Sequence, residues 1–158
     1  MIAWRIIKTR YAAHPLSFAG SLMVSGRWHL AGTPMLYVSA TLSLAALETF
    51  VHLQPYQRHA RHVALQILIP DDAGMEHWDD ADLPAHWNVP GGCPAAQAQG
   101  SAWVNEARAL VLSVPSAVVP FECNLLLNGA HPAFGGLRVA SAEAFAFDER
   151  LWKRPVGG

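Results

Sequence analysis

Three residues with complementary chemistry follow one another along the first third of the chain. Arg27 lies in Gly26-Arg27-Trp28, Tyr37 follows ten residues later, and Glu48 lies within a run of apolar residues. An arginine can hold a phosphate through two parallel hydrogen bonds, and a tyrosine ring can stack on an aromatic cation. A carboxylate can stabilise positive charge that develops on a sugar carbon. Because charged side chains are costly among apolar residues unless they are paired or used, these positions are the first candidates for a site.

Two interpretations of these residues are open. A phosphate, a cationic aromatic ring and a ribose carbon occur together in NAD⁺, whose nicotinamide is a positively charged leaving group on a ribose. The simpler interpretation is structural, because most single arginines, tyrosines and glutamates make ordinary ion pairs or hydrogen bonds, and Arg27 and Glu48 could form one buried salt bridge. Residue types and spacing alone favour the structural interpretation. The first interpretation requires Arg27 and Glu48 to face one shared pocket.

Three successive elements must position these side chains. A short buried strand at residues 35–38 carries Tyr37, and a helix capped by Ser39 or Thr41 carries Glu48 and runs to about Gln54, before Pro55. Apolar residues fill more than half of the circumference of this helix, which predicts that it is largely buried, with Glu48 at the border of the apolar face. Arg27 falls in residues 12–33, which are rich in Gly, Ser, His and Pro and predict a structured loop.

The remaining patterns predict an α+β fold. Strands are predicted at residues 3–7, 63–69, 109–114, 124–127 and 144–147, a second helix at 95–108, and a long irregular loop at 70–94. Strands with few helices and long loops between them are typical of the α+β class. The length of 158 residues fits one domain that spans residues 1–158.

Composition argues against several classes of protein. The net charge of −1 and the scattered 11 Lys and Arg residues argue against direct nucleic-acid binding. No apolar run approaches the ~18–20 residues of a membrane span, and Cys93 and Cys123 are typical of thiols in a cytoplasmic protein. His59 and His62 have no further ligand at metal-site spacing, so no metal is expected. Charged residues make up only 15%, which predicts that some surface is covered by a partner or a second copy.

A series of short motifs runs in a fixed order along nearly the whole chain. The motifs are Trp4-Arg5-Ile6, Arg10-Tyr11, Phe18-Ala19-Gly20, Gly26-Arg27-Trp28, Gly32-Thr33-Pro34, Tyr37-Val38-Ser39, Leu44-Ala45-Ala46-Leu47-Glu48 with His52, Val114-Pro115-Ser116, Asn124-Leu125-Leu126-Leu127-Asn128 with His131-Pro132, and Phe147-Asp148-Glu149-Arg150-Leu151. In this order they resemble the RES-domain family, the toxins of Xre–RES toxin–antitoxin modules. The family is named for an arginine, a glutamate and a serine.

The resemblance implies a fold similar to that of ADP-ribosyltransferases and cleavage of the nicotinamide–ribose bond of NAD⁺. Arg27, Tyr37 and Glu48 match the family's arginine, tyrosine and glutamate. Ser116 is the expected serine, with Ser113 as the alternative. Two further residues, Arg10 and Tyr11, match an N-terminal pair expected in the same pocket.

On this basis we expect the toxin of a type II toxin–antitoxin system, which degrades NAD⁺ by hydrolysis or phosphorolysis and arrests growth. Transfer of ADP-ribose to a cellular protein is an alternative, and a non-enzymatic interaction module is a second. The expected partner is an Xre-type helix-turn-helix antitoxin, in a hetero-oligomeric complex for which the antitoxin supplies DNA binding. Two departures from the family pattern, His29 for asparagine and Gly129 for proline, bear on loop geometry and substrate detail rather than on the reaction class.

Overall fold

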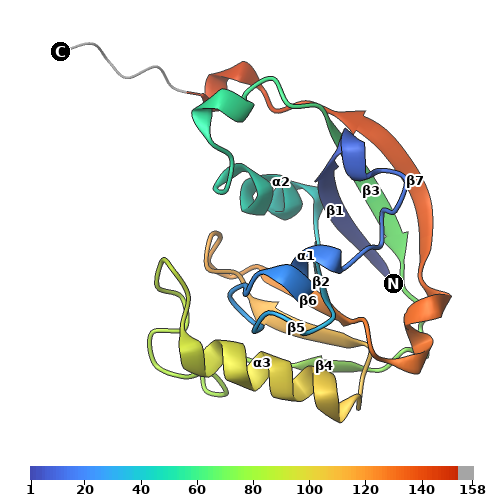
Figure 1. The fold of residues 1–158 in the computed structure, drawn as a ribbon, viewed down its shortest axis with the longest axis vertical. Coiled ribbons are helices and arrows are strands. Elements are labelled where there is room, and N and C mark those ends of the chain that lie inside the picture. The colour runs from blue at the N-terminus through green and yellow to red at the C-terminus, as the bar shows by residue number, and fades with distance from the viewer. Residues whose placement is uncertain (153–158) are drawn as a thin grey trace.

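A seven-stranded sheet in the order β4-β5-β6-β2-β1-β3-β7 forms the framework of the chain (Figure 1). The computed structural model describes residues 1–152. All neighbouring strands are antiparallel except β4 and β5, which run parallel. The strands are β1 (Ile2–Lys8), β2 (Met35–Ser39), β3 (His62–Leu68), β4 (Met75–His77), β5 (Val111–Pro115), β6 (Cys123–Asn128) and β7 (Arg138–Phe145). The α-helices are α1 (Ala19–Met23), α2 (Leu42–Phe50) and α3 (Pro94–Glu106); the 3-10 turns are η1 (Thr9–Tyr11), η2 (Pro55–Gln57), η3 (Pro132–Gly136) and η4 (Glu149–Leu151).

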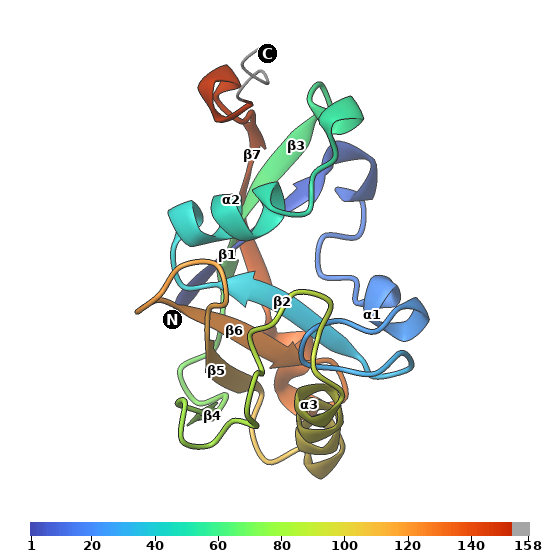
Figure 2. The ribbon, with the colours of Figure 1, turned by 90° about the vertical axis from the view of Figure 1, so that its left-hand side faces the viewer.

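The sheet is nearly divided between β1 and β2. These strands share a single register pair, Trp4 with Ser39, whereas β1 pairs with β3 along its whole length. As a result, β1, β3 and β7 form one half and β2, β6, β5 and β4 the other, and the two halves run in different directions (Figure 1). The helix α2 lies against both β1 and β2, on the side that faces the viewer in Figure 2. The division therefore leaves an opening beside α2.

The helix α3 covers the second half of the sheet and encloses a core around Trp28 and Trp103. Gly100 is required at this contact, because a Cβ atom built there would lie 1.9 Å from the carbonyl oxygen of Trp28. The glycine lets the segment that carries Arg27 pack directly on the helix. No helix within residues 1–152 is long and apolar enough to cross a bilayer.

The α+β class is confirmed, and six predicted elements correspond to observed ones: β1, β2, β3, β5, β6 and α3. Three predictions about elements or their ends were wrong. A short helix, α1, lies within the predicted loop at residues 12–33, and β4 lies within the predicted loop at 70–94. The last strand was predicted at residues 144–147 but is β7, which ends at Phe145. The β7 sequence is rich in small residues, and its partner β3 lies far away in the sequence, so local periodicity did not reveal the first part of the strand.

The helix α2 also differs from its prediction. Thr41 is the cap, since its Oγ1 accepts the N–H of Leu44 at 3.1 Å, and the helix ends at Phe50 rather than near Gln54. Only Leu44 and Ala45 are fully buried. The prediction of a largely buried helix was wrong, because α2 packs on the sheet along one side only and its other sides face the opening or solvent.

Candidate active site

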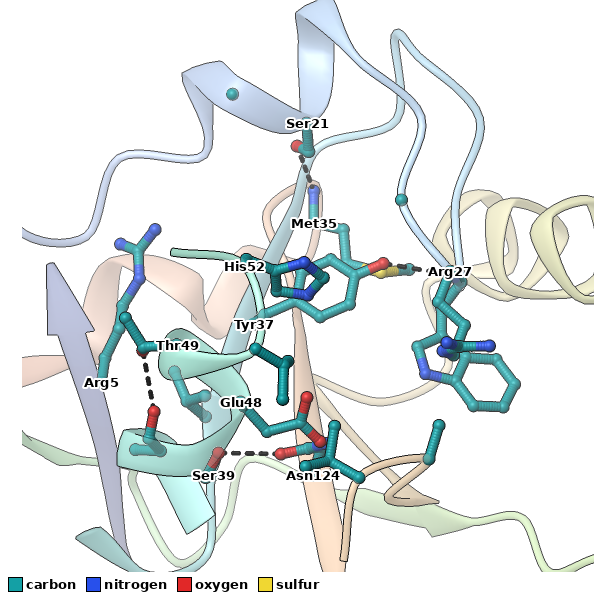
Figure 3. Close-up of a pocket in the computed structure, with 18 of the residues that line it drawn as sticks. Arg5, Ser21, Arg27, Met35, Tyr37, Ser39, Glu48, Thr49, His52 and Asn124 are labelled. Carbon is teal, nitrogen blue, oxygen red and sulfur yellow. Dashed lines mark hydrogen bonds between the residues drawn. The ribbon is translucent and has the colours of Figure 1, made fainter. Parts of the chain in front are cut away.

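A cavity of about 1090 Å³ opens where β1 and β2 diverge. Ligand pockets for small molecules usually occupy about 300–1,000 Å³, so this one has room for a dinucleotide. Arg27, Tyr37 and Glu48 all line it, from the loop before β2, from β2 and from α2 (Figure 3). None of the ion pairs within residues 1–152 joins Arg27 to Glu48. The buried salt bridge of the simpler interpretation is therefore not formed, and the two charges face one pocket.

Two hydrogen bonds fix the carboxylate of Glu48. The hydroxyl of Ser116 donates to Oε1 at 2.7 Å, and the Nδ2 of Asn124 donates to the same oxygen. Each donor is held in turn: Ser116 Oγ accepts the N–H groups of Val118 and Val119, both at 3.0 Å, and Asn124 Oδ1 accepts from the Ser39 hydroxyl at 2.8 Å. Hydrogen bonds to a charged acceptor are the stronger ones. The carboxylate is thus held in one orientation at the wall of the pocket.

Ser116 and Ser113, the two candidates for the family's serine, occupy different environments. Ser116 contacts Glu48 from the segment that follows β5. Ser113 lies inside β5, where its carbonyl accepts the N–H of Trp78, and it is not part of the pocket wall. Ser116 is itself 93% buried behind the wall, so it contacts the carboxylate and not the open cavity. Its role remains a prediction, but its position fits one that acts through Glu48.

A loop holds Arg27 from one side. Its Nη1 donates to the carbonyls of Trp87 and Val89, at 2.8 and 3.0 Å. Trp87 is anchored because its ring stacks on Trp28, with ring centres 5.3 Å apart, and its Nε1 donates to Asp80. Both carbonyl bonds use one nitrogen, and within residues 1–152 no hydrogen bond engages the other guanidinium nitrogens of Arg27. Those nitrogens can serve an anionic ligand.

The hydroxyl of Tyr37 is held by groups of the loop before β2. It accepts the N–H of Trp28 at 3.1 Å and lies 2.7 Å from His29 Nδ1. Burial raises the pKa of Tyr37 well above its ordinary value, so the phenol stays neutral at physiological pH. Gly26 makes this arrangement possible, since a Cβ there would lie 2.8 Å from the Tyr37 hydroxyl. Tyr37 can therefore offer an aromatic face but is poorly suited to act as a base.

Arg10 and Tyr11, which we expected in the pocket, lie outside its wall. Both are exposed in η1, where the Arg10 guanidinium lies 4.8 Å from the centre of the Tyr11 ring. The reason is that β1 extends to Lys8, so the pair begins only after the strand has passed the cavity. A different arginine, Arg5 on β1, lines the pocket instead.

Sequence reasoning assigned no role to Arg5, His29 or Asn124. Arg5 donates from Nη1 to the carbonyl of Pro15 at 2.7 Å, and burial lowers its pKa to about 10, so it remains charged at neutral pH. Asn124 meets Glu48 through the register of β2 with β6, a long-range pairing that local patterns do not reveal.

Within residues 1–152, no group of three or more His, Cys, Asp and Glu side chains could hold a metal ion.

Comparison with known proteins places these residues in a family. The sequence profile of the RES domain matches residues 2–148. A protein of Sphingobium sp. (strain YBL2) named "Prs ADP-ribosylating toxin" is 33% identical, over 96% of each chain. A "Toxin Res" of Photorhabdus laumondii subsp. laumondii is also 33% identical, over 97% of this chain and 98% of its own.

A solved structure shares the fold at lower identity. It is the crystal structure of the M. tuberculosis MbcT–MbcA toxin–antitoxin complex, with a TM-score of 0.71, 16% identity, and coverage of 92% of this chain and 84% of that one. The profile spans the strands, the helices and every residue of the pocket wall. The chain with its divided sheet and its Arg27–Tyr37–Glu48 pocket therefore belongs to the RES-domain family.

Proposed function

We propose that this chain is the toxin of a toxin–antitoxin pair and that it consumes NAD⁺ by cleaving the nicotinamide–ribose bond. One observation carries the proposal: Arg27 and Glu48 line the same cavity without pairing, and each is held by other groups. A purely structural arginine and glutamate would be expected to neutralise each other or to face solvent. The names of the relatives, "Toxin Res" and "Prs ADP-ribosylating toxin", support the same reading.

In the proposed mechanism, the free nitrogens of Arg27 bind the pyrophosphate and the ring of Tyr37 stacks on the cationic nicotinamide. The C1′–N bond breaks, its electron pair passes to the nicotinamide nitrogen, and positive charge develops at C1′. Glu48 stabilises that charge, while Ser116 and Asn124 keep the carboxylate in place. Water or inorganic phosphate then attacks C1′ and gives up a proton. We assign no substrate contact to Arg10 or Tyr11, because they lie outside the pocket wall.

The second candidate function keeps the same bond cleavage but passes ADP-ribose to a protein. The name of the Sphingobium relative, an ADP-ribosylating toxin, favours it. NAD⁺ labelled in the adenylate, incubated with the chain and a bacterial lysate, distinguishes the two. A labelled protein band supports transfer. Free labelled ADP-ribose, or ADP-ribose with phosphate attached at the carbon that carried nicotinamide, supports degradation.

We also propose an antitoxin partner of the Xre helix-turn-helix type, which would cover part of the apolar surface. Several large apolar side chains stand exposed on this protein, including Leu22, Met23 and Val24 around the end of α1, where Val24 reaches the pocket wall. This fits a partner that covers the mouth of the pocket. If a helix-turn-helix protein is encoded beside this gene, co-expression followed by size-exclusion chromatography tests the pairing: separate elution would contradict it.

The central test measures nicotinamide release from NAD⁺ by the purified chain. We expect release with the natural sequence and loss of it with Glu48→Gln, which keeps the size of the side chain and removes its charge. Glu143→Gln is the matched control, because Glu143 is exposed on the edge strand β7. Lack of both nicotinamide release and protein labelling by the natural chain would favour the non-enzymatic alternative. Full activity of Glu48→Gln would contradict the role given to Glu48.

A further inference from the structure

His29 is a buried polar side chain that connects Tyr37 to the backbone. Only 3% of its surface is exposed. Its Nδ1 lies 2.7 Å from the Tyr37 hydroxyl, and its Nε2 lies 3.0 Å from the carbonyl oxygen of Val24. Both ring nitrogens therefore have a partner, and the ring joins the segment after α1 to the strand that carries Tyr37.

The partners of His29 define where its proton lies. A carbonyl oxygen can only accept, so Nε2 must carry the hydrogen that is donated to Val24. In the neutral ring, Nδ1 is then an acceptor, and the Tyr37 hydroxyl donates to it while its oxygen accepts the N–H of Trp28. The phenolic proton is thus directed at His29 Nδ1, so the neutral imidazole fixes the Tyr37 ring in position.

We propose that His29 is a positioning residue for the Tyr37 ring, and that the pocket accepts a cationic ring well only while the imidazole is neutral. The inference rests on the proposed function in one respect, namely that Tyr37 stacks on a cationic nicotinamide. Protonation would place a hydrogen on Nδ1, directed at the hydroxyl oxygen. The phenolic O–H would then have to turn away from His29, and a positive charge would stand beside the surface that receives the cation.

The surroundings of His29 favour the neutral form. Burial lowers its pKa, and the carbonyls of Val24 and Ser21 oppose that shift without cancelling it. The titratable group that contacts it is Tyr37 on β2, and α3 contributes the uncharged Gln97, which donates to Gly26. The charged Arg27, two residues earlier in the chain, directs its guanidinium to the carbonyls of Trp87 and Val89. No carboxylate within residues 1–152 pairs with the ring. An added proton would therefore find no counter-charge.

The experiment measures KM and kcat for NAD⁺ between pH 5 and 8. For the natural chain we expect KM to rise as pH falls through the pKa of His29, which burial lowers from the ordinary value of about 6.5, approaching tenfold per pH unit once His29 is protonated, while kcat changes less. In His29→Asn, the amide oxygen replaces Nδ1 as acceptor and does not titrate, so KM should stay level. In His29→Phe the acceptor is lost, and KM should be raised at every pH. His59→Asn, which is exposed and outside the pocket wall, should keep the pH dependence of the natural chain.

The same pH dependence of KM in His29→Asn as in the natural chain would overturn the inference, as would a natural KM in His29→Phe at pH 8. Imidazole ¹⁵N NMR of the ligand-free protein separates this failure from failure of the proposed function, since it needs no turnover. At pH 7 it should show a neutral His29 with the hydrogen on Nε2; a hydrogen on Nδ1, or a charged ring, would overturn the inference. If the natural chain does not consume NAD⁺, the proposed function fails, and the NMR result alone decides whether neutral His29 holds Tyr37.

Discussion

Removal of the Ser116 hydroxyl is the sharpest test of how Glu48 is held. Ser116→Ala deletes a 2.7 Å hydrogen bond to Oε1 and leaves Asn124 as the remaining donor. A hydrogen bond to a charged group contributes about 1.5–3 kcal/mol. If that contribution is realised in the transition state, kcat should fall by about 10- to 150-fold. Nicotinamide release at saturating NAD⁺ measures it.

Ser113→Ala is the matched control, because it removes the same hydroxyl three residues earlier, inside β5 and away from Glu48. We expect it to keep kcat within about twofold. Ser116→Ala also frees the N–H groups of Val118 and Val119, so Ser116→Thr, which restores a hydroxyl, should recover most of the activity. Natural activity in Ser116→Ala, or an equal loss in Ser113→Ala, would show that Ser116 does not support catalysis through Glu48.

Three further predictions follow from the packing around the pocket. Trp87→Ala removes the stacking on Trp28, worth about 0.5–1.5 kcal/mol, and should raise KM for NAD⁺ by about 2- to 12-fold through looser support of Arg27; an unchanged KM would contradict this. Gly100→Ala should lower stability to chemical denaturation, because the clash with the Trp28 carbonyl, about 1–3 kcal/mol, outweighs a helix-propensity gain of about 1 kcal/mol; a stabilised variant would contradict it. His62→Phe should raise stability by about 1 kcal/mol, since neither buried ring nitrogen makes a hydrogen bond within residues 1–152. Burial lowers the pKa of His62 in the folded protein, so folding is favoured while the imidazole is neutral, above the unfolded pKa of about 6.5. This contribution to stability is lost as pH falls from about 6.5 through the lower folded pKa. Thermal unfolding of His62→Phe should therefore show a smaller loss of stability below about pH 6.5 than the natural chain.

The sequence predicted the central elements because their signals are local. The cap at Thr41 and the apolar spacing of α2 lie within one short segment, and the apolar residues of β2 and of β5 are likewise close together in the sequence. The strands β4 and β7 depend on partners far along the chain, and neither has a strong pattern of its own. Their positions required the sheet topology.

The pocket shows the same limit at the level of single residues. The chemical types of Arg27, Tyr37 and Glu48 indicated a site, and the structure places all three at one cavity. Asn124 could not be assigned a contact with Glu48, because the two meet only through the pairing of β2 with β6. Arg10 was expected in the pocket from a motif, but the length of β1 carries it past the cavity.

The single register pair between β1 and β2 has a mechanical consequence. The backbone of Glu48 belongs to a helix whose buried residue Ala45 packs with Ile6 of β1, while its carboxylate is bonded to Asn124 of β6 and to Ser116 after β5. Glu48 therefore links the two halves of the sheet at the boundary between β1 and β2. Shortening it to alanine would loosen the contact between the halves as well as remove a charge, whereas glutamine keeps an oxygen for the same donors. Loss of activity in Glu48→Ala would therefore combine two effects. Faster amide hydrogen exchange in β2 of Glu48→Ala than in Glu48→Gln would reveal the loosened contact between the two halves of the sheet.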